Sequence, residues 1–384
     1  MVGSNSTHPS ARFKLNPSVN IHLEKNFRPR RMDCYQLPKT FDIQTTLNCW
    51  AKIMGSGNQE NLSLDYHSMT YEGVVQPPFI KLEALDKLRK EHPLRSSDIV
   101  IATFPKCGTT LMQQIVLTLL ADGDGSKVRR PMEMSPWLEA WVSNQGLAAF
   151  EKWHPEQNGW NGLENFHNLD SNWCPSRRVL KTHAPAQLAP WIGRTESEWM
   201  NGARIIVVTR NPKDAAVSHY HHTIDLPHIF RYNGSWDHFL TKLWIPGKVE
   251  SGSFWRWHKS WWDVFQSGSI KLLWMSYEDL IIRPKELIRQ IAEFIQVEPT
   301  LKVVEGVLEA SKFESMKQIA AEEDAKMVAI GKADQVKKNH IRQGTSGSWL
   351  KVFTEDQNKL MNRHHTGECS RLSLPPRLFP KINL

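Results

Sequence analysis

Short, continuous hydrophobic runs alternate with longer segments of helical spacing along this chain. Residues 99–104, 178–182 and 204–209 are runs of mainly β-branched or aliphatic residues, and 269–274 is a fourth. Runs of this length without polar alternation are typical of strands that a parallel sheet buries on both faces. The alternation of strands and helices therefore predicts an α/β fold, a P-loop-like parallel sheet flanked by helices.

Helical spacing is clearest directly after the first of these runs. From Thr109, hydrophobic residues recur at Leu111, Met112, Ile115 and Val116, which lie on one face of a helix. We expect further helical segments at 80–91, 136–150, 212–220, 252–265, 283–294, 299–308 and 354–364. The polar stretch 320–340 has no such period and is predicted to be a flexible loop or lid.

The pattern divides the chain into three parts. Residues 1–70 have no sustained period and no acidic residue before Glu24, which predicts a poorly ordered or loosely packed extension. Their acid-poor, serine- and arginine-containing composition leaves an organelle transit segment open as the minority alternative. Residues 71–375 contain the alternating elements and form the predicted domain, and 376–384 are a C-terminal tail.

Composition removes several classes of function. A chain of 384 residues with 40% hydrophobic content can bury a large core. We find no run of apolar residues long enough to span a membrane and no segment of the secretory-leader type, which predicts a cytoplasmic protein. The five cysteines are scattered and lack metal-ligand spacing, which predicts reduced thiols. The net charge of +8 suits an anionic ligand. Without long basic runs or a nucleic-acid-binding motif, we do not expect nucleic acid as that ligand.

The candidate chemistry begins at the end of the first strand. The order Pro-Lys-Cys-Gly-Thr-Thr over 105–110 would aim backbone N–H groups, a helix N-terminus, the Lys106 ammonium and the hydroxyls of Thr109 and Thr110 at one point. Such a loop favours phosphate binding. It is not a Walker A loop, because the lysine precedes the single glycine. A strand, turn and helix with an incidental lysine is the plain alternative.

Two later strand ends also bear polar side chains. Lys181 and His183 follow the second strand, and open parallel sheets place catalytic groups at that edge. Arg210 follows the third strand and Ser218 lies on the next helix, so the two could hold a second phosphate. The plain alternatives are that His183 has only a structural role and that Arg210 is simply paired with Asp214.

Five separated segments match one family in order and in spacing, namely 104–110, 181–185, 210–220, 252–262 and 342–349. Over residues 71–371 the chain resembles the soluble, cytosolic-type sulfotransferases that use 3′-phosphoadenosine 5′-phosphosulfate (PAPS). The resemblance implies a single sulfotransferase domain that transfers the sulfuryl group of PAPS to a hydroxyl or amine of a small acceptor. It implies no metal, since the lysine meets the charge of the leaving phosphate.

The resemblance also implies a role for each site residue. His183 would be the general base, Lys106 would stabilise the leaving phosphate, and Lys181 would help to stabilise charge. Lys106, Thr109 and Thr110, with backbone N–H groups, would hold the 5′-phosphosulfate, and the neighbouring loop residues Cys107, Gly108 and Leu111 would also contact the cofactor. The 3′-phosphate would contact Arg210, Ser218, Arg342, Gln343 and Gly344. The adenine site would be lined by Tyr277, Ser311 and Phe313.

The chain departs from the family pattern at three places. Leu111 replaces a tryptophan that stacks on adenine, a contact worth about 1–3 kcal/mol in comparable base-stacking sites. Gln343 replaces a lysine, so its contact with a phosphate would be neutral and weaker. The segment that forms dimers in the family is poorly kept, which leaves the oligomeric state open. None of the three departures affects Lys106 or His183, so transferase activity is still expected.

Two other functions stay open from the sequence alone. One is a P-loop nucleotide kinase, against which the loop order and the missing Walker B acid speak. The other is an inactive relative that binds the bisphosphate product. Thirteen of the 16 tryptophans lie between Trp137 and Trp262, which favours an apolar or aromatic acceptor if some of them line a pocket.

Overall fold

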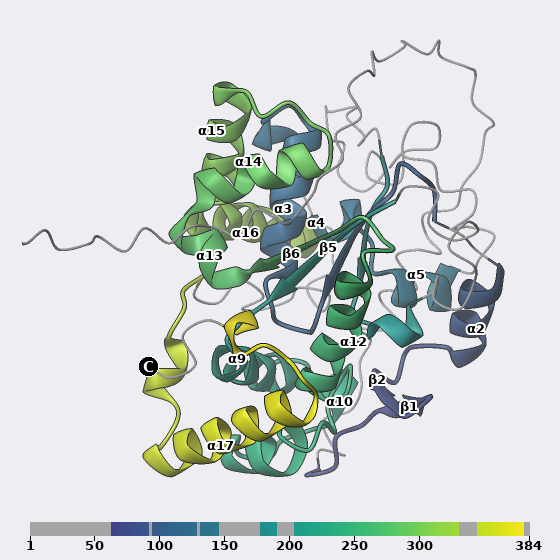
Figure 1. Ribbon diagram of the computed structural model, residues 1–384, viewed down its shortest axis with the longest axis vertical. Coiled ribbons are helices and arrows are strands. Elements are labelled where there is room, and N and C mark those ends of the chain that lie inside the picture. The colour runs from purple at the N-terminus through teal and green to yellow at the C-terminus, as the bar shows by residue number, and fades with distance from the viewer. Residues whose placement is uncertain are drawn as a thin grey trace, which may run out of the picture. The chain divides into compact units, whose positions relative to one another are not determined.

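A parallel sheet forms the centre of the chain. The computed structural model describes residues 63–91, 94–128, 131–145, 177–189, 203–329 and 344–379. Within these ranges the sheet has four strands in the order β4-β3-β5-β6 (Figure 1). Their bounds are β3 (Ile99–Thr103), β4 (Val179–Thr182), β5 (Arg204–Thr209) and β6 (Leu272–Ser276).

Every neighbouring pair in this sheet is parallel. The residues of β3, β4 and β5 are buried throughout, as their unbroken hydrophobic runs predict. Along β3, Val100 and Ala102 pack into one hydrophobic cluster, whereas Ile99 and Ile101 pack into another. The sheet is therefore covered on both faces, and the predicted α/β fold class is confirmed.

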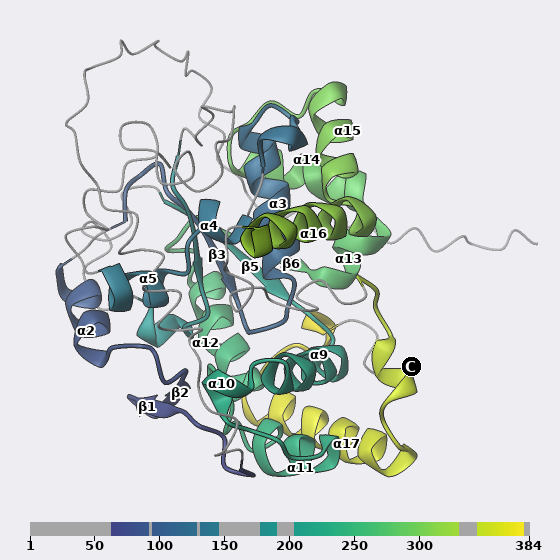
Figure 2. The same ribbon diagram turned by 180° about the vertical axis from the view of Figure 1, so that it is seen from behind.

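Helices of two groups cover the faces. Residues of α3 (Thr109–Leu120), α14 (Pro284–Phe294) and α15 (Leu301–Ala310) contribute to one cluster. The other cluster takes residues from α9 (Pro212–Ile224), α12 (Phe254–Ser267) and α17 (Glu355–Arg371), and Figures 1 and 2 show the two groups on opposite sides of the strands. The remaining helices are α2 (Leu82–Glu91), α4 (Pro131–Met134), α5 (Leu138–Gln145), α10 (Pro227–Phe230), α11 (Trp236–His238), α13 (Tyr277–Ile282) and α16 (Phe313–Ala329), and Phe239–Trp244 is π-helical.

The strand order fixes where a site can form. From β3 the chain reaches β4 on one side, and β5 then pairs with the other side of β3. The carboxyl ends of β3, β4 and β5 meet at one edge, next to this reversal of strand order, where α/β sheets bind ligands. The loop after β3, the His183 segment after β4 and Arg210 after β5 all leave the sheet at this edge.

The prediction of a flexible loop over 320–340 was wrong for its first half. Helix α16 continues from Phe313 to Ala329, and residues 330–340 lie outside the described ranges. Alanine, glutamate, glutamine, lysine and methionine make up much of 317–329, and these residues have high helix propensity without needing an apolar face. The weak hydrophobic period of this stretch therefore did not indicate a loop.

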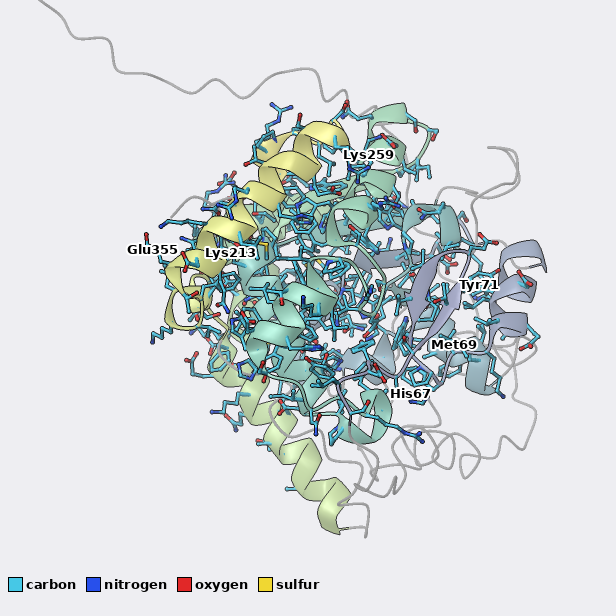
Figure 3. All side chains as sticks on the ribbon, turned by 90° about the horizontal axis from the view of Figure 1, so that it is seen from below. His67, Met69, Tyr71, Lys213, Lys259 and Glu355 are labelled. Carbon is cyan, nitrogen blue, oxygen red and sulfur yellow. The ribbon has the colours of Figure 1, made fainter. Side chains whose placement is uncertain are left out.

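A two-stranded hairpin, β1 (Met69–Tyr71) and β2 (Val74–Gln76), precedes the sheet and was not predicted. Upstream of it, the N–H of Ser63 donates to the carbonyl of Arg231 at 2.9 Å, and that of His67 donates to Phe230 at 2.8 Å. Figure 3 shows His67, Met69 and Tyr71 following one another along this edge. Residues 63–70, which the sequence assigned to the extension, thus contact the last residue of α10 and the residue after it.

A buried ion pair joins β3 to β4 at their amino ends. The Arg178 Nε donates to Asp98 Oδ1 at 2.7 Å, and its Nη2 donates to Asp98 Oδ2. Both side chains are almost fully buried. The Asp98 carboxylate also accepts the backbone N–H of Arg95 at 2.7 Å. This pair lies at the end of the sheet opposite to the candidate site.

Candidate active site

The loop after β3 has an unusual backbone that leads into α3. Lys106 has a φ of 70° and Gly108 has a φ of 101°, both in the left-handed region. A non-glycine residue in that region is strained, and such strain persists where the surrounding structure enforces it. Gly108 is the N-cap of α3 and makes no side-chain cap bond. A glycine at this position lets a ligand approach the helix N-terminus closely, as a phosphate cradle requires.

Gly108 also has no room for a side chain. A Cβ atom added there would lie 2.7 Å from Cδ2 of Tyr277, which begins α13. Tyr277 is buried, and the Cζ of Arg210 lies 4.4 Å from the centroid of its ring, within cation–π distance. The structure thus brings three predicted nucleotide contacts, Gly108, Arg210 and Tyr277, together.

Arg210 connects the loop to a turn far along the sequence. Its Nη1 donates to the carbonyl of Lys106 at 3.0 Å, and its Nη2 donates to the carbonyl of Thr345 at 3.3 Å. The Asp214 carboxylate accepts instead from the N–H groups of Gly347 and Trp349, at 2.7 and 3.1 Å. The alternative in which Arg210 simply pairs with Asp214 is therefore not what the structure has.

His183 is joined to the same loop through threonines. Its Nδ1 lies 2.8 Å from the carbonyl oxygen of Thr103, so this nitrogen carries the proton and donates. The Thr103 hydroxyl lies 2.7 Å from that of Thr109, a predicted ligand of the phosphosulfate. In this tautomer the Nε2 of His183 keeps its lone pair, which is the form that a general base needs.

Burial and two lysines keep His183 neutral. Burial, the Lys181 charge and the Lys106 charge lower the pKa of His183 well below its usual value, and the bond to Thr103 opposes them only in part. The ring of Trp137 meets the His183 ring edge-on at 5.1 Å, and the Lys181 Nζ lies 5.3 Å from the Trp137 centroid. The predicted catalytic residues Lys106, Lys181 and His183 therefore lie in one electrostatic environment.

Glu139, on α5, holds the backbone on both sides of His183. Its Oε1 accepts the N–H of Ala184 at 3.0 Å and the hydroxyl of Thr182. Burial raises the pKa of this carboxyl. On the other side, the Nε1 of Trp257 donates to the His183 carbonyl at 2.9 Å. Glu139 and Trp257 thereby fix the position of the segment.

We expect Glu139→Ala to lower kcat by about 10- to 100-fold, because a displaced base loses its near-attack geometry. Glu139→Gln keeps an acceptor oxygen and should retain most of the activity. The measurements are kcat and the affinity for the bisphosphate product. Neither variant should change that affinity. An alanine variant with unaltered kcat would show that the contacts to Thr182 and Ala184 do not position His183.

Two predicted loop residues, Cys107 and Leu111, pack into the hydrophobic clusters on the two faces of the sheet. The Cys107 side chain is fully buried in a hydrophobic cluster, and burial raises the pKa of its thiol. Its N–H donates to the Phe104 carbonyl at 3.1 Å. Leu111 is half-buried and packs against the other cluster. That second cluster also contains Tyr277, a predicted contact of the adenine.

The remaining predicted residues lie on three further segments. Phe313 covers Gly344, since a Cβ on Gly344 would lie 2.3 Å from the Phe313 ring. The Ser311 hydroxyl donates to the Val307 carbonyl at 2.7 Å. Ser218 is half-buried on α9. Arg342 and Gln343 lie outside the described residues.

Sequence reasoning missed Thr103, Trp137 and Glu139. Thr103 is the last residue of β3, and its hydroxyl gives no sequence signal of a link to His183. Trp137 is one of many tryptophans, so only the contact with His183 distinguishes it. Glu139 stands two residues later on α5, and its partners are more than 40 residues away. These contacts depend on tertiary structure.

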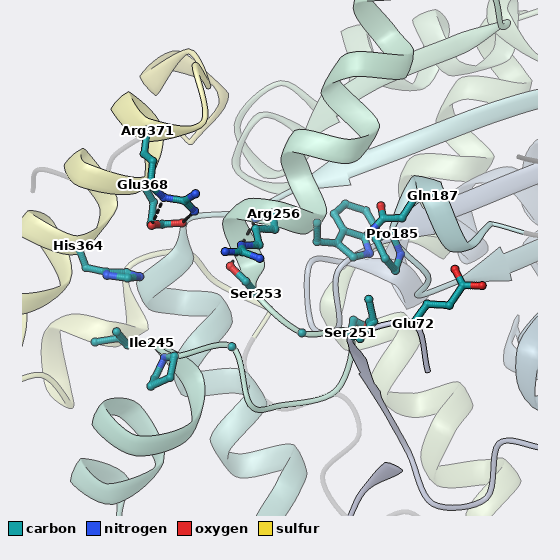
Figure 4. Close-up of a pocket in the computed structure, with 16 residues that line it drawn as sticks. Glu72, Pro185, Gln187, Ile245, Ser251, Ser253, Arg256, His364, Glu368 and Arg371 are labelled. Carbon is teal, nitrogen blue, oxygen red and sulfur yellow. Dashed lines mark hydrogen bonds and ion pairs between the residues drawn. The ribbon is translucent and has the colours of Figure 1, made fainter. Parts of the chain in front are cut away.

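A cavity of about 700 Å³ lies elsewhere in the described structure (Figure 4). It is lined by residues such as Glu72, Arg256 and Glu368 and includes none of the predicted nucleotide contacts. It does share Pro185 and Trp257 with the segment that holds His183. In the described ranges, no cluster of His, Cys, Asp and Glu side chains suits a metal, and every helix is too short or too polar to span a bilayer.

Comparisons with known proteins agree with this geometry. A family model described as the sulfotransferase domain matches residues 96–372. Sulfotransferase 1B1 of the dog (Canis lupus familiaris) is 30% identical over 282 residues, which are 73% of this chain and 86% of the relative. Sulfotransferase 1 family member D1 of the mouse (Mus musculus) is 31% identical over 265 residues, covering 68% and 80% of the two chains.

Solved structures share the fold at lower identity. A mouse sulfotransferase complexed with PAP superposes with a TM-score of 0.60 at 20% identity, covering 81% of this chain and 98% of that one. A retinol dehydratase in complex with androsterone and inactive cofactor PAP gives 0.59 at 19% identity, covering 83% and 93%.

Proposed function

Because this chain belongs to the sulfotransferase family, it is a sulfuryl-transferring enzyme, and we propose that its donor is PAPS and its acceptor a small molecule with a free hydroxyl or amine. The single observation that best supports this proposal is the link from the loop through Thr109 and Thr103 to His183, which joins an anion cradle to a base. Structural neighbours solved with the product PAP add support for the donor.

The residues at the sheet edge fit a nucleotide with two separated phosphates. The N-terminus of α3, where the N-cap is Gly108, suits one phosphate together with Lys106, and Arg210 with Ser218 suits the other. The Nε of Arg210 is buried without a hydrogen-bond partner, so this guanidinium has capacity left for a ligand. The bound nucleotide would supply the sulfuryl group, which is transferred as the bond between sulfur and the 5′-phosphate oxygen breaks.

His183 provides the proton acceptor for the attacking group. Its neutral Nε2 takes the acceptor proton while a bond forms between the acceptor oxygen or nitrogen and sulfur. The Nδ1–H donated to the Thr103 carbonyl holds the ring in that tautomer and steadies the positive charge that develops. General bases of this kind contribute about 10²–10⁴-fold to rate.

Lys106 provides the charge that meets the leaving group. Its ammonium lies on the loop that begins the cradle, where negative charge develops on the departing phosphate oxygen. Lys181 adds a second positive charge on the acceptor side, next to Trp137. A fixed cation at a developing oxyanion is worth on the order of 10²–10³-fold.

The pH dependence of kcat/KM follows from the direction of the His183 pKa. Since burial and Lys181 lower that pKa below 6.5, neutral imidazole persists as the pH falls, and activity is lost only when the pH drops through the lowered value. In Lys181→Met the pKa should rise, so the acid limb of kcat/KM should move to higher pH. Lys181→Arg keeps the charge and should keep the wild-type limb. If the acid limb of kcat/KM lay at the same pH in Lys181→Met and in the wild type, His183 would not be the titrating group whose pKa Lys181 lowers.

The direct test is incubation of the purified chain with PAPS carrying labelled sulfur and a panel of phenols, alcohols and amines. Transfer of label to an acceptor is the expected result. Stabilisation by adenosine 3′,5′-bisphosphate without any transfer would indicate an inactive relative, and stabilisation by Mg-ATP alone would indicate a kinase. The domain bounds of 71–375 and the cytoplasmic location remain predictions.

A further inference from the structure

Asp214 is a fully buried acidic residue that the proposed mechanism does not use. It stands third in α9, which begins at Pro212. Its Oδ1 accepts the hydroxyl of Ser348 at 2.8 Å and the N–H of Trp349 at 3.1 Å. Its Oδ2 accepts the N–H of Gly347 at 2.7 Å. One carboxylate on α9 thus holds three consecutive residues of a turn that lies far along the sequence.

This turn takes its acceptor from outside itself. Gly347 is the N-cap of the short 3₁₀ helix η6 (Ser348–Lys351) and makes no side-chain cap bond. The first N–H groups of a helix have no partner within the helix, and a carboxylate is favourable beside them. Asp214 supplies that carboxylate. The neighbouring Lys213 packs on the same turn, with its Nζ 4.1 Å from the ring centroid of the buried Trp349.

The upstream end of the same turn meets the candidate nucleotide site. The Nη2 of Arg210 donates to the carbonyl of Thr345 at 3.3 Å. Gly344 lies against the ring of Phe313, which leaves no room for a Cβ. By resemblance to the family, Gly344 and Arg210 are expected to contact the 3′-phosphate. Only one residue separates Thr345 from the three that Asp214 holds, so a shift of the held end would also move the contact with Arg210.

The charge of Asp214 argues for a positioning role. A carboxylate repels a phosphate, and both of its oxygens already accept bonds from the turn. A position that served packing alone would favour an apolar side chain, because burying a charge is costly unless hydrogen bonds compensate. Three donors also need more than the single acceptor oxygen that a carboxamide offers. The residue type therefore matches the turn and not the ligand.

We propose that Asp214 is a positioning residue for the donor nucleotide, which holds the turn 344–349 so that Gly344 and Arg210 are arranged for the 3′-phosphate before the nucleotide binds. This inference rests on the proposed function. The apparent affinity for a ligand falls in proportion to the fraction of molecules whose site is correctly arranged. Asp214 therefore sets how strongly the enzyme prefers a nucleotide with a 3′-phosphate to one without it.

The test compares two nucleotides that differ only in that phosphate. Adenosine 3′,5′-bisphosphate (PAP) and adenosine 5′-monophosphate (AMP) are titrated by calorimetry into the full-length wild type and Asp214→Asn. The variant keeps the size of the side chain but loses one acceptor oxygen. We expect PAP affinity to fall by about tenfold and AMP affinity to stay within about twofold. In turnover, the KM for PAPS should rise while kcat at saturating PAPS is kept.

Asp98 offers a matched control. It is also a fully buried carboxylate that accepts a backbone N–H, that of Arg95 at 2.7 Å, but it lies at the opposite end of the sheet. Asp98→Asn should lower the melting temperature and leave the ratio of PAP to AMP affinity as in the wild type. A loss of that ratio in Asp214→Asn alone therefore reports on the turn and not on overall stability.

Ser348→Ala gives a second variant in case Asp214→Asn does not fold. It removes only the hydroxyl that donates to Asp214 Oδ1, so PAP affinity should fall by about two- to fivefold with AMP affinity unchanged. An unchanged ratio in both variants, or equal losses for PAP and AMP, would overturn the inference.

The same titrations separate the inference from the proposed function. A wild type that binds PAP no better than AMP would count against both. A ratio that falls in Asp214→Asn, in a chain that transfers no label from PAPS, would support the inference and count only against sulfuryl transfer.

Discussion

Replacing His183 by alanine is expected to lower kcat by about 10²–10⁴-fold, the usual contribution of a general base. The reason is that Nε2 of His183 is the proposed acceptor for the proton of the attacking group, and the bond from Nδ1 to the Thr103 carbonyl holds the ring in the tautomer that can accept it. The measurement is the initial rate with labelled PAPS at saturating acceptor. Affinity for PAP should stay within about twofold, because the base acts in the transition state and not in nucleotide binding.

Two further measurements give this experiment its control. The variant must still be folded at the assay temperature, which its melting temperature checks, because His183 is buried and its loss leaves a small cavity. Added imidazole should restore part of the rate to the alanine variant by supplying the missing base. Turnover within a few-fold of wild type would show that His183 is not the base, whatever its geometry.

The largest expected effect on stability is that of Asp98→Ala. This substitution leaves the Arg178 guanidinium buried without its carboxylate and should cost about 3–5 kcal/mol, the range for breaking a buried ion pair. It also removes the acceptor for the Arg95 N–H, which adds to the loss. Urea unfolding followed by tryptophan fluorescence measures the change in the free energy of unfolding.

The double variant Asp98→Leu with Arg178→Met separates charge from packing. Apolar residues of similar volume often replace a buried ion pair at little cost, so this variant should recover much of the lost stability. If Asp98→Ala unfolded with the wild-type midpoint, the pair would not stabilise the junction of β3 and β4. Activity should be little affected in the folded double variant, because the pair lies at the opposite end of the sheet.

Buried strands were the part of the fold that sequence could predict well. The run at 204–209 coincides with β5, and the runs at 99–104 and 178–182 differ from β3 and β4 by a residue. The fourth strand, β6, begins three residues later than predicted because its pairing with β5 sets its limits. Helix α17 continues to Arg371, beyond the predicted end at 364, since a polar surface helix needs no strong hydrophobic period.

The candidate site was predictable where chemistry is local in the sequence and not where it depends on tertiary contacts. Lys106, Gly108 and Thr109 stand in one loop, and the positions of Arg210 and His183 follow from the rule for strand ends. In contrast, the carbonyl contacts of Arg210 join positions that are 104 and 135 residues away.

The manner in which Arg210 binds its neighbours has a consequence for experiments on this enzyme. Its hydrogen bonds end on the main-chain oxygens of residues 106 and 345, so exchanging either side chain leaves the bridge intact. In the proposed mechanism, a lysine analogue of graded basicity at position 106 would therefore change the charge that meets the leaving phosphate while the two bonds from Arg210 to the main chain are kept.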